Sequence, residues 1–288
     1  MQTYKNAVMD NARWAGFESR PGDIFVCTPA KCGTTWTQMI VANLLWPDGE
    51  FPAPIVNGIS PWIEAKFMPV DALHEMLRAQ QHRRAMKSHT PADGIPWFDD
   101  AKYITVARDG RDAFMSWCNH MSRMKMTEML NEQAAKEGIA EMKSFDGVDY
   151  KGYFHEWLEE NNFFDVVASY WARRGQSNLL FVHFNNLKAD LEQEMRRIAR
   201  FLNIELEESQ WPAVVERCTF EGMRSADKKV GDFDAAFEGG IEGFVYKGTN
   251  GRWHDVLDKD DLAAYQRKVK EALPEDAAHW VESGSLGK

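Results

Sequence analysis

A segment near the N-terminus combines the residue types that bind phosphate. Thr28-Pro-Ala-Lys-Cys-Gly-Thr-Thr-Trp36 follows an apolar run over 24–28 and precedes a second apolar stretch. A loop between a strand and a helix presents free amide groups at the helix N-terminus, where the helix dipole favours an anion. Lys31 adds a full charge, Gly33 allows close approach of the backbone, and two threonine hydroxyls can donate hydrogen bonds. We predict an anion-binding loop rather than a plain corner with a solvated lysine.

The loop differs from two other phosphate-binding loops. In the GxxxxGK[ST] motif of P-loop NTPases the lysine follows the second glycine, whereas Lys31 precedes the single glycine here. A cysteine-dependent phosphatase loop would need an arginine at the position that holds Gln38. Because Cys32 stands beside a lysine near a helix start, we expect its pKa to be lowered. We still interpret Cys32 as a small loop residue and not as a nucleophile.

Two further segments place polar side chains after short apolar runs. Arg108-Asp-Gly-Arg-Asp-Ala-Phe-Met-Ser116 follows the run 103–107. The guanidinium group of Arg108 suits a phosphate, although a lone Arg-Asp pair such as Arg108–Asp109 is more often a structural ion pair. If a helix starts near Arg111, Ser116 lies about two turns into it.

Lys87-Ser-His89 follows the run 84–87, and the two side chains are predicted to project into one crevice. Histidine is the side chain best able to accept a proton near neutral pH, so His89 is the candidate general base. Tyr246-Lys-Gly-Thr-Asn-Gly-Arg-Trp253 is rich in glycine and positive charge. It predicts a flexible loop that could close over a phosphate, although alone it is typical of a surface turn.

These segments need a scaffold, and the sequence predicts one. The apolar runs 24–28, 84–87, 103–107 and 179–184 are typical of buried parallel strands. Helical patterns cover 34–46 and 186–202, the second with Asn186 as its expected N-cap. We therefore predict a single α/β domain over residues 1–288, with a mostly parallel sheet flanked by helices and a phosphate loop after the first strand. Ligands of such folds bind beyond the carboxyl ends of the strands.

The segment 124–163 carries mixed charge, methionines and aromatic residues. It predicts helical segments joined by loops, which form either a lid or an ordinary surface insertion. The region 239–253 is the predicted closing loop.

Composition excludes several classes of protein. The 288 residues carry 34 basic and 44 acidic side chains, a net charge of −10 that repels nucleic acids and anionic membranes. The longest apolar stretch, 39–46, is far shorter than the roughly 20 residues that a membrane span needs. The four cysteines form no CxxC pair, which favours reduced thiols and a cytoplasmic location. Residue spacing predicts no metal site.

Four of these segments together resemble the cytosolic PAPS-dependent sulfotransferases, which use 3′-phosphoadenosine 5′-phosphosulfate (PAPS). Segment 28–36 is similar to the family's 5′-phosphosulfate loop TYPKSGTTW, and 108–116 is similar to its 3′-phosphate motif. Lys87-Ser-His89 is similar to the Lys-Thr-His segment that carries the catalytic base. Segment 246–253 is similar to the closing loop RKGxxGDW. The matches lie in the family's order and span residues 28–253.

The resemblance implies a role for each matching residue. The 5′-phosphosulfate would be bound by the loop residues Lys31, Cys32, Gly33, Thr34 and Thr35. The adenine would be contacted by the aromatic residues Trp36, Phe184 and Phe220. The 3′-phosphate would be held by Arg108, Ser116, Lys247 and Gly248, beside Tyr246. The catalytic residues would be His89, Lys31, Lys87 and Ser116.

The sequence departs from the family pattern at several positions. Cys32 replaces a serine, and Phe184 stands where an adenine-contacting tyrosine is usual. Tyr246 replaces the arginine of the closing loop, and Arg252 replaces its aspartate. The family's dimerisation segment is not recognisable in 254–263, so the oligomeric state stays open. The pattern is that of a divergent member.

The resemblance implies in-line transfer of a sulfuryl group from PAPS to a hydroxyl or amine, with the 3′,5′-bisphosphate PAP as product and no metal. Lys31 and the loop amides would stabilise charge that develops on the leaving phosphate. Lys87 would neutralise the sulfuryl oxygens, and His89 would take the proton of the acceptor.

Two other functions remain possible from the residues alone. A P-loop kinase or NTPase would need magnesium, for which Asp109 is the only obvious ligand. A non-catalytic nucleotide-binding module would not depend on His89. The acceptor, a phenol, alcohol or lipid-like molecule, is not specified by the sequence. Several aromatic residues form either an apolar pocket for it or part of the core: Trp62, Phe67, Trp97, Phe98 and Trp117.

Overall fold

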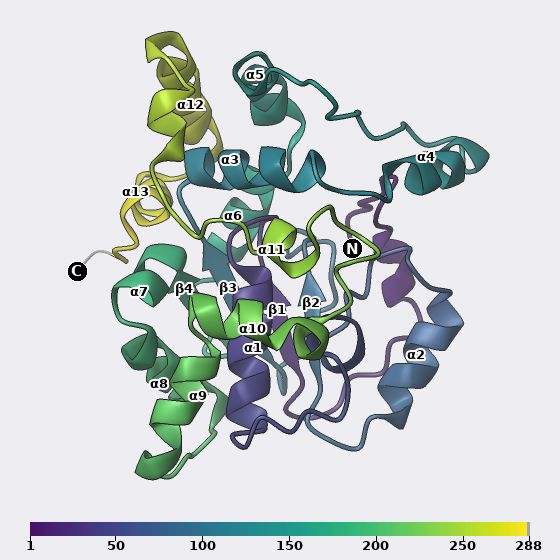
Figure 1. Ribbon diagram of the computed structural model, residues 1–288, viewed down its shortest axis with the longest axis vertical. Helices are drawn as coiled ribbons and strands as arrows, with labels where there is room; N and C mark the ends of the chain where they lie inside the picture. Colours follow the sequence, from purple (N-terminus) through teal and green to yellow (C-terminus); the bar gives the residue numbers. More distant parts are fainter. Residues whose placement is uncertain (287–288) are drawn as a thin grey trace.

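Four parallel strands form the sheet of the computed structural model, which describes residues 1–286 (Figure 1). The strands are β1 (Ile24–Cys27), β2 (Ala85–Ser88), β3 (Lys102–Ala107) and β4 (Leu179–His183), in the order β2-β1-β3-β4. Each coincides with a predicted run to within one residue at either end. The predicted α/β class with a parallel sheet is confirmed.

The two faces of the sheet are both covered by helices because successive strand side chains point to opposite faces. Ile24 and Val26 of β1 pack into one core, and Phe25 and Cys27 pack into the other. The first core includes helices α1 (Thr34–Leu45), α7 (Phe184–Ala189), α8 (Leu191–Leu202), α9 (Trp211–Arg217), α10 (Phe220–Val230) and α11 (Gly240–Phe244). The second includes α2 (Val70–Ala79), α3 (Gly110–Met121), α5 (Tyr150–Glu160), α6 (Phe163–Trp171), α12 (Lys259–Ala272) and α13 (Glu275–Ser283).

The region predicted as one helix from Asn186 contains two. Asp190 has an extended backbone with φ −150°, which ends α7, and its carboxylate accepts a hydrogen bond from the Gln193 amide to cap α8. His183 caps α7 by accepting from the Asn185 amide. The prediction of Asn186 as N-cap was wrong, because its side chain donates to the Gly284 carbonyl instead.

A buried ion pair joins β1 and β2 at their amino ends. The guanidinium group of Arg84 donates to both carboxylate oxygens of Asp23, over 2.9 and 2.5 Å. Both residues are 2% exposed. Since this pair lies at the opposite end of the strands from the loops that follow them, it stabilises the scaffold without entering the predicted site.

Residues 124–163 contain α4 (Thr127–Lys136) and α5, joined by an extended segment that runs across the top of the molecule in Figure 1. Among residues 1–286, no helix combines the length and the apolarity that crossing a bilayer requires.

Candidate active site

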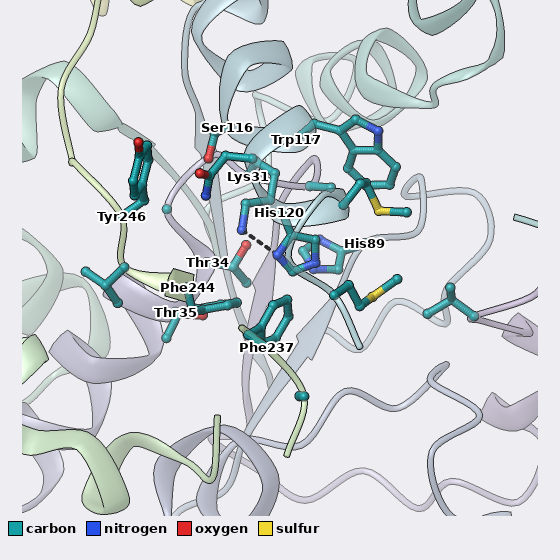
Figure 2. Close-up of a pocket in the computed structure, with 18 of the residues that line it drawn as sticks. Lys31, Thr34, Thr35, His89, Ser116, Trp117, His120, Phe237, Phe244 and Tyr246 are labelled. Atoms are coloured by element: carbon teal, nitrogen blue, oxygen red, sulfur yellow. Dashed lines mark hydrogen bonds between the residues drawn. The ribbon is translucent and has the colours of Figure 1, made fainter. Parts of the chain in front are cut away.

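The carboxyl ends of the four strands converge on one large cavity. Cys27 at the end of β1 is in register with Ser88 of β2, and Ala107 of β3 is in register with His183 of β4. The residues that follow these positions therefore emerge at one edge of the sheet. They line a cavity of about 1510 Å³, part of which is drawn in Figure 2.

The loop after β1 has the geometry of an anion cradle. Gly33 caps α1 with φ 103°, a left-handed conformation that favours glycine, and a Cβ there would lie 3.1 Å from the ring of Phe184. Lys31 also has a positive φ of 68°. The hydroxyls of Thr28 and Thr34 share a 2.6 Å hydrogen bond. The turn thereby presents the first amides of α1 and the side chain of Lys31 to the same cavity.

Lys31 is held without a carboxylate partner. Its Nζ lies 3.1 Å from Nδ1 of His120 and 4.6 Å from the centre of the Phe244 ring. Burial, followed by the positive charges of Lys87 and Arg108, lowers the pKa of Lys31 to about 7. By Coulomb's law a bound anion raises that pKa again, so the lysine is charged when it contacts a phosphate or sulfate.

Cys32 differs from expectation. It is fully buried, its Sγ faces the Ala30 carbonyl, and it does not line the cavity. Burial raises the pKa of its thiol to about 12, which outweighs the nearby positive charges. The predicted lowering of this pKa was wrong. Desolvation of the thiolate raises the pKa by more than the positive charge of the neighbouring lysine lowers it.

His89 has a defined tautomer. Its Nδ1 donates to the Thr28 carbonyl over 2.8 Å, which leaves the lone pair of Nε2 free. Burial and the charge of Lys87 lower the pKa of His89 to about 3, so the ring is neutral at physiological pH. The indole of Trp62 lies edge-to-face with His89 at 4.8 Å. His89 thus has the protonation state that a general base requires.

Lys87 points into the same cavity from the end of β2. Its Nζ lies 4.7 Å from the centre of the Trp62 ring, and burial lowers its pKa to about 8. Lys31, Lys87 and His89 therefore line the same cavity.

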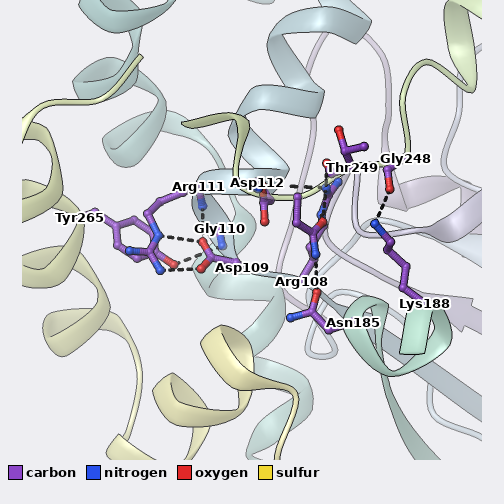
Figure 3. Close-up of polar contacts among 12 residues, drawn as sticks. Arg108, Asp109, Gly110, Arg111, Asp112, Asn185, Lys188, Gly248, Thr249 and Tyr265 are labelled. Carbon is purple, nitrogen blue, oxygen red and sulfur yellow. Dashed lines mark hydrogen bonds and ion pairs between the residues drawn. The ribbon is translucent and has the colours of Figure 1, made fainter. Parts of the chain in front are cut away.

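Arg108 follows β3 and binds the predicted closing loop (Figure 3). It is 4% exposed, and its Nη2 donates to the Thr249 carbonyl over 2.9 Å and to Asn250 Oδ1 over 2.6 Å. Asp109 caps α3 and pairs with Arg111 over 2.5 Å, so it is not the partner of Arg108. Asp112 lies 4.0 Å from Arg108.

The remaining aromatic residues of the predicted nucleotide site cluster beside α1. Trp36 lies edge-to-face with Phe184 at 5.3 Å, and the Phe184 ring lies 4.3 Å from the Arg108 guanidinium. Phe220 packs under the closing loop, where a Cβ on Gly248 would approach within 2.9 Å of its ring. Gly248 has φ 61°, so both conformation and space favour glycine there.

All the predicted site residues except Cys32 line this one cavity: Lys31, Gly33, Thr34, Thr35, Trp36, Lys87, His89, Arg108, Ser116, Phe184, Phe220, Tyr246, Lys247 and Gly248. Of the unassigned aromatic residues, Trp62, Phe67 and Trp117 also line it, whereas Trp97 and Phe98 pack against the core. Sequence reasoning missed His120, Phe237 and Phe244. The spacing of His120 four residues after Ser116, on one helical face, was the available signal.

The cavity suits an anion. Lys31, Lys87 and Lys247 take part in no ion pair within the part of the chain that the structure describes. Lysines that pair with no carboxylate are an electrostatic match for phosphate and sulfate groups. No group of three or more His, Cys, Asp or Glu residues between 1 and 286 is placed to hold a metal ion.

Comparison with known proteins identifies the family. The model of the sulfotransferase domain matches residues 21–276. The chain belongs to the sulfotransferase domain family. Curated relatives include a glycolipid sulfotransferase of Mycobacterium bovis, 28% identical over 99% of this chain and 95% of the relative. Human sulfotransferase 1C2 is 26% identical over 92% of this chain and 89% of the relative.

Solved structures share the fold of this chain. Mouse sulfotransferase SULT7A1, complexed with PAP, superposes with a TM-score of 0.70 at 18% identity, covering 94% of this chain and 91% of the mouse chain. A retinol dehydratase in complex with androsterone and PAP has a TM-score of 0.65 at 21% identity, covering 93% and 87%. A P-loop kinase or NTPase is not favoured: Asp109, its only obvious metal ligand, is engaged by Arg111 and lies outside the cavity lining.

Proposed function

We propose that this sulfotransferase uses PAPS as the donor and transfers its sulfuryl group to a hydroxyl or amine of a small, largely apolar acceptor. One observation carries the proposal: Lys31, Lys87 and Arg108 meet a neutral His89 in a single cavity at the carboxyl ends of β1, β2 and β3. The PAP complexes of the structural neighbours support the choice of nucleotide.

The nucleotide would lie between the β1 loop and the closing loop. Lys31 and the amides of Gly33, Thr34 and Thr35 would bind the 5′-phosphosulfate. Trp36, Phe184 and Phe220 would contact the adenine. Arg108, Ser116, Lys247 and Gly248 would hold the 3′-phosphate, with Tyr246 beside them, and would select against ATP, which lacks that phosphate. To reach it, Arg108 must exchange its contacts with Thr249 and Asn250.

The reacting groups would lie on the wall formed by β1 and β2. The free Nε2 of His89 would take the proton of the acceptor as its oxygen or nitrogen attacks sulfur. The ammonium group of Lys87 would lie against the sulfuryl oxygens, and Lys31 would stabilise the charge that develops on the leaving phosphate. Charges aimed at the transition state in this way accelerate the step more than they strengthen ground-state binding.

The acceptor half of the cavity favours an apolar, lipid-like molecule. Its walls include Trp62, Phe67, Met68, Met121, Met124 and Phe237. The cavity of about 1510 Å³ exceeds the roughly 300–1000 Å³ typical of one small-molecule pocket, so it has room for a nucleotide together with a second sizeable molecule. The glycolipid sulfotransferases among the relatives support a lipid alcohol or sugar hydroxyl as the target.

We further propose that two segments cover the site. Residues from 124–163 that line the cavity include Met124, Met126, Met142 and Phe145, which makes this segment a candidate lid. The closing loop, 239–253, contributes Phe244 through Thr249 to the lining.

A sulfate-transfer assay with PAPS and a panel of phenols, steroids, lipid alcohols and glycolipids tests the proposal. The His89→Ala variant is expected to lose about 10²–10⁴-fold in turnover because the general base is removed, while calorimetry shows PAP binding near normal. Transfer to no acceptor by the parent protein would argue for a non-catalytic nucleotide-binding module. Unchanged turnover in the variant would remove His89 from the mechanism.

A further inference from the structure

A second histidine contacts the machinery of the proposed site. His120 lies near the end of α3, one helical turn after Ser116, and both line the cavity. Its Nδ1 is 3.1 Å from the Nζ of Lys31, the contact dashed in Figure 2. Among residues 1–286 this is the one side chain within hydrogen-bonding distance of that ammonium group.

The chemistry of the two groups fixes the tautomer of His120. When Lys31 is protonated, its ammonium group only donates hydrogen bonds, so Nδ1 of His120 offers its lone pair and the ring proton resides on Nε2. Burial and the charges of Lys31 and Lys87 keep the pKa of His120 well below its ordinary value. His120 is therefore neutral, and its tautomer is the opposite of that of His89, whose Nδ1 carries the proton.

Aromatic packing holds the imidazole in this orientation. The ring of His120 lies 4.7 Å from that of Phe237 and 5.7 Å from that of Phe244. Phe244 also lies 4.6 Å from the Lys31 ammonium, which is thus bracketed between an aromatic face and an imidazole nitrogen. A lysine has four rotatable side-chain bonds, so such bracketing removes most of its freedom before a ligand arrives.

We propose that His120 is a positioning residue that directs the ammonium group of Lys31 toward the reacting phosphosulfate. A carboxylate at this position would neutralise the lysine. A neutral imidazole fixes its direction and leaves the full charge available for the leaving phosphate. This inference rests on the proposed function, because it assigns His120 a role through Lys31.

Two substitutions separate the hydrogen bond from the packing. His120→Phe keeps a ring beside Phe237 and Phe244 but removes the acceptor atom, and it is expected to lower kcat about 10-fold with less than about 3-fold change in the PAP dissociation constant. His120→Asn places an amide oxygen near the site of Nδ1 and is expected to recover most of kcat. His279→Phe, on the exposed side of α13, is the matched control and should retain parental activity.

A double-mutant cycle tests whether His120 acts through Lys31. In a Lys31→Ala background, His120→Phe is expected to change kcat by less than about 2-fold, because the group that it positions is gone. An equal loss in both backgrounds, a parental kcat in His120→Phe, or no recovery in His120→Asn would overturn the proposal. Thermal melts of each variant show whether the fold is intact.

A spectroscopic measurement on the free protein tests the contact independently of turnover. Long-range proton–nitrogen NMR of the histidine side chains, recorded below the Lys31 pKa of about 7 so that the lysine is charged, should show His120 neutral with its proton on Nε2, and its Nδ1 signal should move in Lys31→Ala. A proton on Nδ1 of His120, or an Nδ1 signal that does not move in Lys31→Ala, would refute the contact. Failure of the parent protein to transfer sulfate would overturn the proposed function and the role of His120 in it, while the NMR result still decides whether the contact exists.

Discussion

At the scale of single residues, the site depends on two lysines, Lys31 and Lys87, that the fold buries without a carboxylate partner. Lys31 and Lys87 are desolvated beside one another, so their pKa values fall to about 7 and about 8. This arrangement is costly for the free protein and favourable once an anion binds. The same environment keeps His89 neutral, so the lone pair of its ring is available to accept a proton.

The desolvated lysines predict a pH-dependent affinity for PAP. A lysine loses its charge as pH rises through its pKa, and a bound anion raises that pKa. Binding should therefore take up protons between about pH 7 and pH 9, and affinity should fall as pH rises through this window. Calorimetry in buffers of different ionisation enthalpy measures the uptake. Lys31→Arg, which stays charged, should take up fewer protons, and an uptake of zero in the parent would contradict the shifted pKa values.

Arg108 is expected to act through donor affinity. Its substitution by Ala removes the charge-assisted hydrogen bonds assigned to the 3′-phosphate, which should weaken PAP binding about 10- to 100-fold and change kcat far less. Arg111→Ala is the matched control, since Arg111 follows the same strand but pairs with Asp109 and does not line the cavity. A PAP dissociation constant unaltered in Arg108→Ala would refute the assigned contact.

At the scale of elements, the carboxyl ends of the parallel strands position the site residues, and the amino ends hold a buried ion pair. The register of β1 with β2 and β3 brings Thr28, His89 and Arg108 to one edge of the sheet. At the other edge, Asp23 and Arg84 form a fully buried pair. The carboxyl ends of the strands therefore serve the proposed function, and the amino ends contribute to stability.

Breaking the buried pair should destabilise the protein strongly. Arg84→Met leaves the Asp23 carboxylate buried and unpaired, which is expected to lower the free energy of unfolding by about 3–5 kcal/mol. Lys228→Met removes exposed pairs with Asp232 and Asp234, in which every side chain is more than 60% exposed, and should change the free energy of unfolding far less because solvent screens such pairs. Urea unfolding measures the stability of both variants. Similar losses in the two variants would show that the Arg84–Asp23 pair is not important for stability.

At the scale of the whole molecule, one cavity combines segments from nearly the full length of the chain. Tyr4 through Met9, the 124–163 segment and the closing loop all contribute to its lining. A nucleotide bound there contacts parts of the chain that are far apart in sequence, so binding should stabilise the fold as a unit.

Thermal unfolding therefore distinguishes the possible nucleotides. At about 100 times its dissociation constant, PAP should add about 2.7 kcal/mol and raise Tm by roughly 5 °C. Magnesium ATP at the same concentration should have a much smaller effect, because it has no 3′-phosphate for Arg108. A larger shift with magnesium ATP than with PAP would contradict the assigned nucleotide site.

The sequence by itself determined the strands, the order of the motifs and nearly every lining residue that we assigned. Each of these depends on local patterns: an apolar run of strand length, a glycine at a helix start, a lysine and a histidine two residues apart. It also indicated the family, because several short motifs keep their types and order along the chain.

Only the tertiary structure decided how these groups affect one another. The pKa of Cys32 depends on burial that loop sequence does not reveal, and Asp190 ended a helix that periodicity alone extended. The contact between His120 and Lys31 joins residues 89 positions apart. Such effects arise from desolvation and from contacts between distant segments, which are properties of the packed molecule and not of any local stretch of sequence.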